Sequence, residues 1–563
     1  MNNTKIYAGD VSAGSLRERK AWCFSHAGQT AERVLEAKRA VLQLIGKWDQ
    51  AMEAAVKCLK LAEDRNDLER KAKSLSDIGS IHYIRGDYKL ALAQHEMSLR
   101  ISNEIGYKHG QAISLYDIGN IHSRRGDNNK ALDYLGRSLE MFEKAGDRSG
   151  QSASLNSISK IHKTHGNYDP ALKLLERALI IRQEIDDQTG QAVSLNSIGV
   201  IHYERGNYVS ALEHINKSLK IRKKIGDKPG QVGSLHNIGI IHYTRGDNSS
   251  ALKYYQASLD ILSEIGDRSG QAASLNNIGL IHGDRGDFAK ALECHMKSLR
   301  IGEDIGERRI QASNLHNIGE IYTAWDEYAL ALNCLEKAYG IRLEIADRQG
   351  QASSLESIGF IHKQRGDHAL ALKHMEESLG IKEEIGDRWG QAISLNGIGG
   401  IMIEATNYTV ALERLGRSLS IQGEVGVNTL RCETLCEIAK ANVHLGQFSQ
   451  ARKEIEEGRA LSREQKSDVD EVKCHKAYGL LYWKEGDIGK AGEHFEKAVS
   501  LCREQRWKNR LAHALFDYGR MLKASGERER ARSCMQESRT LFGEMGLEHW
   551  VEKVEVELKA AAF

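Results

Sequence analysis

The chain has 563 residues, 41% of them hydrophobic, and only two are proline, Pro170 and Pro229. Lys and Arg number 79 against 77 Asp and Glu, which gives a net charge of +2. This balance argues against a protein that grips nucleic acid along its length, because neutralising many phosphates takes a strong basic excess. The scarcity of proline suits long helices.

The nine cysteines are scattered and form no Cys-x-x-Cys pair, although Cys432 and Cys436 are one helical turn apart. This pattern is typical of free thiols in a reducing compartment. No apolar run reaches the length of about 18 residues that suggests a membrane span. The N-terminal segment lacks the apolar stretch of a signal peptide. We therefore expect a cytoplasmic protein that binds neither a membrane nor nucleic acid.

A 40-residue repeat dominates the chain. Alanine marks it at Ala51, Ala91, Ala131, Ala171, Ala211, Ala251, Ala291, Ala331, Ala371, Ala411, Ala451, Ala491 and Ala531. A repeat held in register indicates a stack of like units around one continuous core, in place of several globular domains.

Residues 271–310 show what one unit contains. Small and apolar residues between Ala272 and His282 recur mostly at spacings of three and four, which is one face of a helix. Arg285-Gly286-Asp287 interrupts this pattern, since glycine allows the left-handed conformation that ends a helix. A second helical face runs from Ala291 to Ile301. Each unit is therefore predicted to be a hairpin of two helices, here called helix A and helix B.

Glycine recurs within helix A, where it is unfavourable by about 1 kcal/mol relative to alanine. The series is Gly79, Gly119, Gly199, Gly239, Gly279, Gly319, Gly359 and Gly399. Small residues let two helices cross closely, at interaxial distances of roughly 8 Å. The recurrence predicts a close crossing of helices A and B that offsets the cost.

A hairpin with Leu/Ile-Gly in helix A, Gly-Asp at the turn and Ala-Leu opening helix B resembles the tetratricopeptide repeat, whose usual length is about 34 residues. The phrase SLNNIGLIHGDRGDFAKAL is similar to the long repeats of spindle-orientation scaffolds of the Partner-of-Inscuteable kind and to arrays in bacterial signalling proteins. The resemblance covers thirteen units in residues 31–550. It implies an all-α, right-handed α-solenoid of helical hairpins in which helix A lines the concave face.

In chain order, we expect an N-terminal extension (1–30), a main array (31–430), three diverged units (431–550) and a C-terminal capping helix (551–563). Residues 12–30 suit a helix that caps the array. Residues 71–390 are nearly uniform, whereas the diverged units keep the register and lose the recurrent Gln and Asn of helix A. The diverged units are therefore a candidate second binding surface.

The resemblance predicts that solvent-facing residues of helix A line a peptide-binding groove. Asn both donates and accepts, so a ladder of Asn suits an extended peptide backbone. An apolar patch with a polar rim usually marks a binding surface. The predicted groove comprises Asn196, Val200, Tyr203, Asn237, Ile240, Tyr243, Asn276, Asn277, Leu280, His316, Asn317 and Phe360. In the alternative interpretation, Val200, Ile240 and Leu280 simply pack between neighbouring helices.

Histidine recurs at His82, His122, His162, His202, His242, His282 and His362. Successive A helices should stand on the order of 10 Å apart, while a zinc ion needs ligands at about 2 Å. Packing inside the hairpin is therefore favoured over a metal ladder, and no metal site is predicted. The five Arg-Gly-Asp sequences are interpreted as hairpin turns in which aspartate caps helix B, and not as adhesion ligands.

The sequence contains no HExxH, no GxxxxGK[ST] and no GxSxG, so neither an enzyme nor a cofactor is predicted. The main hypothesis is a protein–protein interaction scaffold that binds a peptide or protein segment in its concave groove. The alternative is a regulatory sensor in a signalling system, which binds a peptide or small molecule and modulates a partner enzyme. A third hypothesis, RNA binding with one base per repeat, is opposed by the absence of a basic stripe.

Overall fold

The computed structural model describes residues 35–39, 42 and 47–559, and all regular structure in these residues is helical. The extension expected at residues 1–30 lies outside the described residues. The chain divides into two compact units, residues 1–254 and 255–563, and the division falls inside helix α12 (Asn248–Ile265). The boundaries predicted from the sequence, between the main array, the diverged units and the C-terminal helix, remain predictions. No described helix is long and apolar enough to cross a membrane.

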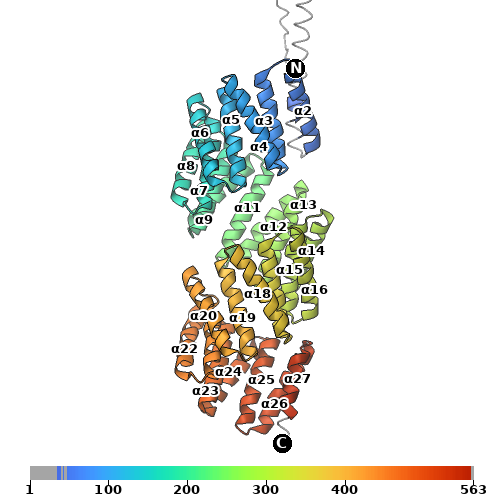
Figure 1. The fold of residues 1–563 in the computed structure, drawn as a ribbon, viewed down its shortest axis with the longest axis vertical. Helices are drawn as coiled ribbons and strands as arrows, with labels where there is room; N and C mark the ends of the chain where they lie inside the picture. The colour runs from blue at the N-terminus through green and yellow to red at the C-terminus, as the bar shows by residue number, and fades with distance from the viewer. Residues whose placement is uncertain (1–34, 40–41, 43–46, 560–563) are drawn as a thin grey trace, which may run out of the picture. The chain divides into compact units, whose positions relative to one another are not determined.

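In the first unit the helices before α12 are α2 (Trp48–Asp64), α3 (Leu68–Ile84), α4 (Tyr88–Glu104), α5 (Lys108–Arg124), α6 (Asn128–Ala145), α7 (Arg148–Thr164), α8 (Tyr168–Glu184), α9 (Gln188–Glu204), α10 (Tyr208–Lys224) and α11 (Lys228–Thr244). Figure 1 draws them as successive antiparallel pairs. From α3 to α25, odd-numbered helices are helix A, and from α2 to α26, even-numbered helices are helix B.

In the second unit the helices after α12 are α13 (Arg268–Asp284), α14 (Phe288–Asp304), α15 (Arg308–Ala324), α16 (Tyr328–Glu344), α17 (Arg348–Gln364), α18 (His368–Glu384), α19 (Arg388–Glu404), α20 (Tyr408–Val425), α21 (Arg431–His444), α22 (Phe448–Gln465), α23 (Asp468–Glu485), α24 (Ile488–Glu504), α25 (Lys508–Ala524), α26 (Arg528–Glu544) and α27 (Glu548–Lys559). The predicted all-α solenoid of helical hairpins is confirmed.

The loops between successive 40-residue repeats share one set of hydrogen bonds, which explains the recurrent Asp and Gly-Gln of these loops. Asp147 precedes α7, and its Oδ1 accepts a hydrogen bond from the backbone N–H of Gly150 at 2.9 Å. This is the usual N-cap arrangement. Gln151 Nε2 then reaches back to the carbonyl oxygen of Phe142 in the preceding helix, at 3.2 Å. The pair therefore satisfies one end of each helix that meets at the loop.

The glycines of helix A lie where helix B crosses closely, as predicted. A Cβ atom added at Gly119 of α5 would stand 2.7 Å from Leu135 Cγ of α6. The equivalent contact in the second unit is between Gly319 and Leu335, also at 2.7 Å. Successive odd-numbered helices touch one another as well, for example α3 and α5, or α15 and α17. The A helices α13 to α25 of the second unit therefore form one continuous layer, and in the first unit α3, α5 and α7 touch in turn, as do α9 and α11.

A buried serine network joins neighbouring repeats. Ser98 on α4 donates a hydrogen bond to the carbonyl oxygen of Ala72 at 2.7 Å, and Ser114 Oγ donates to Ser98 Oγ at 3.1 Å. The bonded residues are 26 positions before and 16 positions after the central serine. The same bond to an alanine carbonyl is made by Ser138, Ser218, Ser298, Ser378, Ser418 and Ser538.

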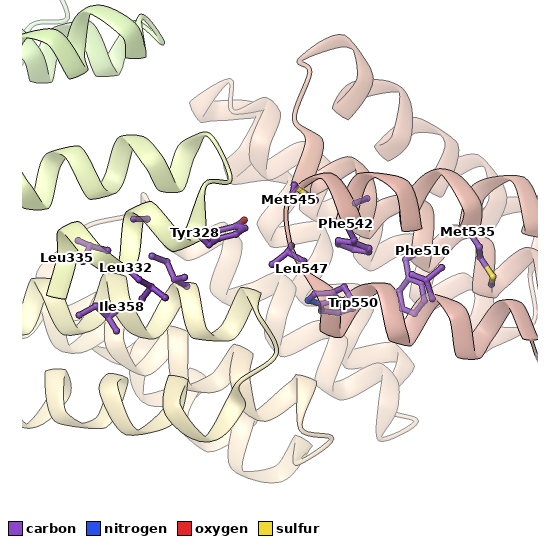
Figure 2. Packing of buried hydrophobic residues seen from close by; sticks show 14 residues of the cluster. Tyr328, Leu332, Leu335, Ile358, Phe516, Met535, Phe542, Met545, Leu547 and Trp550 are labelled. Atoms are coloured by element: carbon purple, nitrogen blue, oxygen red, sulfur yellow. The ribbon is translucent and has the colours of Figure 1, made fainter.

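The end of the second unit packs against α16 and α17 of the same unit. One buried cluster contains Tyr328 and Leu332 of α16 together with Phe542 and Trp550 (Figure 2). Trp550 Nε1 donates to the carbonyl oxygen of Gln364 at 3.0 Å, 186 positions earlier in the chain. Helix α27 therefore buries an apolar face and ties the last repeat to an earlier one.

Candidate functional site

The predicted groove residues all lie on A helices. In the first unit, α9 carries Asn196, Val200 and Tyr203, and α11 carries Asn237, Ile240 and Tyr243; in the second unit, α13 carries Asn276, Asn277 and Leu280, α15 carries His316 and Asn317, and α17 carries Phe360. Because α9 touches α11, and α13, α15 and α17 touch in turn, the structure brings the residues of each unit into neighbouring rows.

Asparagines of neighbouring A helices bond to each other. Asn237 Nδ2 donates to Asn196 Oδ1 at 3.2 Å, and Asn317 Nδ2 donates to Asn276 Oδ1 at 2.9 Å. Each pair is 41 residues apart. The asparagines thus link neighbouring repeats, and some of their amide groups are no longer free to hydrogen-bond a peptide backbone. The signal for this pairing in the sequence is an asparagine at adjacent positions of successive units.

The apolar residues of the predicted groove differ in exposure. Val200 and Ile240 are half-buried, whereas Leu280 is 39% and Phe360 43% exposed. In the register between the last two lies Glu320, whose pKa is raised, chiefly by desolvation, although a hydrogen bond from Ser357 opposes the shift. Leu280, Glu320 and Phe360 therefore form a row of two apolar side chains around one carboxyl on the A-helix face of the second unit.

His316 contacts a neighbouring helix of the array and does not point to a ligand-binding role. Its Nδ1 atom lies 3.3 Å from Nη1 of Arg342, which also donates to the carbonyl oxygen of Gly350 at 2.9 Å. Burial, together with the Arg342 charge, lowers the pKa of His316 to about 4. The imidazole is therefore neutral near pH 7 and suited to accept from the guanidinium. His316 positions Arg342 between two repeats.

The recurrent histidines pack inside their own hairpins. His122 Nδ1 lies 3.2 Å from Asp127 Oδ2, and the ring stacks on Tyr134 with 5.5 Å between centroids. His242 has the same relation to Asp247, at 3.1 Å. This agrees with the packing interpretation of the series.

The aspartates of the Arg-Gly-Asp turns correct one expectation. Asp247 and Asp287 accept a backbone N–H of helix B, as expected of a cap. Asp87, Asp127 and Asp367 make no such bond, and their carboxylates face the histidine five residues earlier. A cap was predicted at all five turns, and it is wrong at three. The histidine contact is present at all five turns, so it does not explain which aspartates cap helix B.

The A-helix face of the diverged units is charged, which the sequence analysis did not identify. Lys440 Nζ lies 2.7 Å from Glu437, and Lys476 Nζ lies 2.9 Å from Asp517. The side chains of Lys440, Glu437 and Lys476 are each only 18–23% exposed. Burial and the charge of Lys476 lower the pKa of His513 to about 3. This face therefore combines half-buried ion pairs with a neutral histidine.

Comparison with protein families gives three matches. A tetratricopeptide repeat model matches residues 110–184, 190–264, 270–344 and 350–424, together more than half of the chain. A second tetratricopeptide repeat model matches residues 477–505. A model described as anaphase-promoting complex subunit 5 matches residues 401–477. Among curated proteins, none matches the chain.

Several solved structures are similar at low identity. BtubC (BKLC) from P. vanneervenii is 17% identical over 38% of this chain and 91% of that chain, with a TM-score of 0.36. A signal transduction ATPase with a tetratricopeptide repeat sensor, from Pyrococcus horikoshii, is 15% identical over 64% of this chain and 55% of that one, with a TM-score of 0.47. Aspartyl phosphate phosphatase F from Bacillus subtilis is 13% identical over 62% and 93%, with a TM-score of 0.44.

Proposed function

The chain belongs to the tetratricopeptide repeat family, and we propose that it is a non-enzymatic, cytoplasmic scaffold that binds a peptide or protein segment along its A-helix face. The observation that carries this proposal is the exposure of Leu280 and Phe360, at 39% and 43%, on that face. An exposed apolar patch with a polar rim usually marks a surface that a partner covers, and these two side chains share one register of the A-helix face. Neither nucleic acid nor a membrane is expected as a partner.

The peptide would contact each unit through two kinds of side chain. Leu280 and Phe360 offer apolar contact, and Asn276 and Asn317 keep hydrogen-bonding groups beyond the one bond that joins them. In the first unit, the half-buried Val200 and Ile240 beside Asn196 and Asn237 offer a similar surface. In most complexes a few interface residues contribute most of the binding free energy, and aromatic residues are enriched among them. We therefore expect Phe360 to matter most.

The test is affinity capture from native lysate with wild type and with Leu280→Asp/Phe360→Asp as baits, followed by mass spectrometry. A captured segment is then synthesised and its Kd measured by fluorescence anisotropy. Loss of a central anchor costs about 2 kcal/mol or more, so we expect Kd to rise at least about 30-fold. The asparagines are poor targets for this test because their substitution also breaks bonds between repeats.

Leu370→Asp is the matched control, because Leu370 lies on α18, a B helix of the same unit, and is 44% exposed. It should leave Kd unchanged, as should the circular dichroism of both variants. If the control abolishes binding while the double variant does not, the partner binds the B-helix face and the proposal is wrong.

A second candidate function, the regulatory sensor, is favoured by the contact between α27 and α16–α18. Trp550 and Asn509 tie the last repeats to Gln364 and Tyr328 by single hydrogen bonds of 3.0 and 2.9 Å. A ligand that preferred the untied state would shift the chain between two conformations. The test is hydrogen exchange with and without the captured partner. A sensor should change protection in α27 and α16 together, and unchanged protection there would exclude this function.

A further inference from the structure

Three cysteines of the diverged units meet in the interior of the second unit. Cys432 and Cys436 lie on α21 and Cys474 on α23, and all three are fully buried. Cys474 Sγ is 3.7 Å from Cys432 Sγ and 3.7 Å from Cys436 Sγ. All three sulfurs lie within 4.8 Å of one another, and no other such group of metal-ligating side chains occurs in the described part of the chain.

This cluster replaces the serine network of the regular repeats. There, a central serine on helix B bonds to residues 26 positions before and 16 positions after it, as Ser98 does with Ala72 and Ser114. The same spacing around Gly458 of α22 gives Cys432 and Cys474. Cys432 therefore occupies the position of Ala72, Gly458 that of the central Ser98, and Cys474 that of Ser114. At this place in the stack, thiols are found where the regular repeats have hydroxyl groups.

Gly458 leaves space beside the sulfurs. From Ser98 to Ser538, every other residue at this repeat position is serine or alanine. A Cβ atom built at Gly458 would lie 3.6 Å from Cys432 Sγ and 3.7 Å from Cys436 Sγ, which is ordinary contact. The side chain that normally fills the centre of the network is therefore missing where the thiols converge.

The sulfur spacing suits a metal ion. Three thiolates bound to one ion at about 2.3 Å place their sulfurs roughly 3.8–4.0 Å apart. The two distances of 3.7 Å are close to this value. Structural zinc takes four ligands, whereas the described residues bring only three suitable groups together here. Soft thiolate ligands suit copper(I), zinc and iron–sulfur clusters, and since structural zinc and iron–sulfur clusters take four ligands, copper(I) fits a set of three best.

We propose that Cys432, Cys436 and Cys474 bind one copper(I) ion through three thiolates. An ion that binds all three sulfurs must displace the thiol protons, which a thiophilic ion does and a hard cation does not. Each thiol gives its S–H proton to solvent as an S–Cu bond forms, and no electron is transferred. This site goes beyond the proposed peptide binding and does not depend on it. It also departs from the sequence-based prediction that the chain holds no metal.

The start of α21 is where we expect an ion to enter the buried site. Cys432 lies in the first turn of this helix, whose N-cap residue Leu430 makes no side-chain bond. In most regular repeats an aspartate caps the equivalent turn, for example Asp387 at the start of α19. An uncapped first turn frays more readily. Fraying would expose Cys432 and let the ion enter.

The experiment is an anaerobic titration of the reduced, full-length protein with copper(I) held by the coloured chelator bicinchoninate. We expect wild type to withdraw one copper per chain. Cys436→Ser and Cys474→Ser should weaken the affinity at least about 100-fold, since even outer-shell substitutions weaken metal sites 10–100-fold. Gly458→Ser should also weaken it, because the hydroxymethyl group occupies the open space while restoring the residue of the regular repeats.

Cys502→Ser is the matched control, because Cys502 is fully buried on α24 and outside the cluster. It should bind copper as wild type does, and circular dichroism should show that every variant stays folded. The proposal is overturned if wild type withdraws no copper, or if Cys474→Ser binds as tightly as wild type. Stoichiometric retention of zinc in preference to copper, or loss of two thiols in air without any metal binding, would overturn it as well.

Discussion

The regular repeats of the first unit and the diverged repeats at the end of the second hold their helices together by different chemistry. In the first unit, serine and asparagine bonds recur between repeats, such as the Ser98–Ala72 bond and the Asn237–Asn196 bond, alongside ion pairs such as Lys163–Glu204. In the diverged repeats, ion pairs such as Lys476–Asp517 and a large aromatic core take the place of the asparagine pairs, while the serine bond is kept at Ser538. The 40-residue register is the same in both regions.

This difference shows that the register depends on few positions. Alanine at the start of helix B is fully buried in both regions, as Ala131 and Ala491 are. Glycine at the helix crossing also persists, as at Gly119 and Gly519. Once these small residues fix the backbone crossing, the polar positions between repeats are free to change. The diverged repeats use that freedom for charges, aromatic rings and thiols.

The largest expected effect is in the aromatic core of the diverged repeats. Trp550 stacks on Phe542 with 5.4 Å between centroids and packs edge-on against His513 at 4.4 Å. Trp550→Ala removes these contacts and the bond to Gln364, and substitutions of this kind cost about 3–5 kcal/mol. Hydrogen exchange should show lost protection in α16 and α25–α27, with α3–α8 unchanged.

Val556→Ala on the same helix is the control, since Val556 is 66% exposed and surface substitutions usually change stability by no more than about 0.5 kcal/mol. Equal effects of the two substitutions would mean that α27 is not part of the core. Lost protection in α3–α8 would mean that the two units do not unfold separately.

A second test asks whether glycine truly fixes the crossing. Gly119→Ala places a methyl group 2.7 Å from Leu135 Cγ. Overpacking costs about 1–3 kcal/mol, which exceeds the gain of up to about 1 kcal/mol in helix propensity. Gly136→Ala, on the adjacent α6, meets nothing within 4 Å and should stabilise the protein. Urea unfolding measures both, and two changes of the same sign would contradict the steric interpretation.

A third test concerns the glutamine that links each regular repeat to the helix before it. Gln351 is 3% exposed, and its Nε2 donates to the carbonyl oxygen of Arg342 at 3.0 Å. Gln351→Ala should cost about 1–2 kcal/mol, since a buried acceptor loses its partner. Gln349→Ala, two residues earlier and exposed, should change the urea midpoint little. A comparable shift for both would show that the buried bond contributes nothing.

The repeat, the hairpin and the close crossing were predictable from the sequence because each follows from local spacing. The contact of Trp550 with Gln364 was not, since nothing local relates residues 186 positions apart. The recurrence of asparagine could be seen in the sequence, but which asparagines of neighbouring helices bond to each other could be seen only in the structure. For the same reason Cys432 and Cys436 could be related by helix geometry, whereas Cys474, on another helix, could not.

The smallest expected effect is a pH dependence in the first unit, at Asp117 on the A-helix face. Burial raises the pKa of Asp117 to about 7, and the neighbouring Asp77 adds to this, while a hydrogen bond from Ser76 opposes it. The imidazole of His95, 3.5 Å away, is neutral in this range because burial lowers its pKa to about 4. It therefore supplies no charge to keep the carboxylate ionised.

The folded chain thus binds a proton at Asp117 that the unfolded chain, with an aspartate pKa of about 3.9, releases earlier. Such a group stabilises the fold fully below pH of about 4, and its contribution is lost as pH rises through about 7. Asp117→Asn should remove this slope and make the protein more stable than wild type at pH of about 8. The full shift corresponds to roughly 4 kcal/mol, but the side chain is 24% exposed and screened by solvent, so we expect on the order of 1 kcal/mol. Urea midpoints at several pH values measure the difference, and parallel curves for the two proteins would show that Asp117 is ionised in the fold.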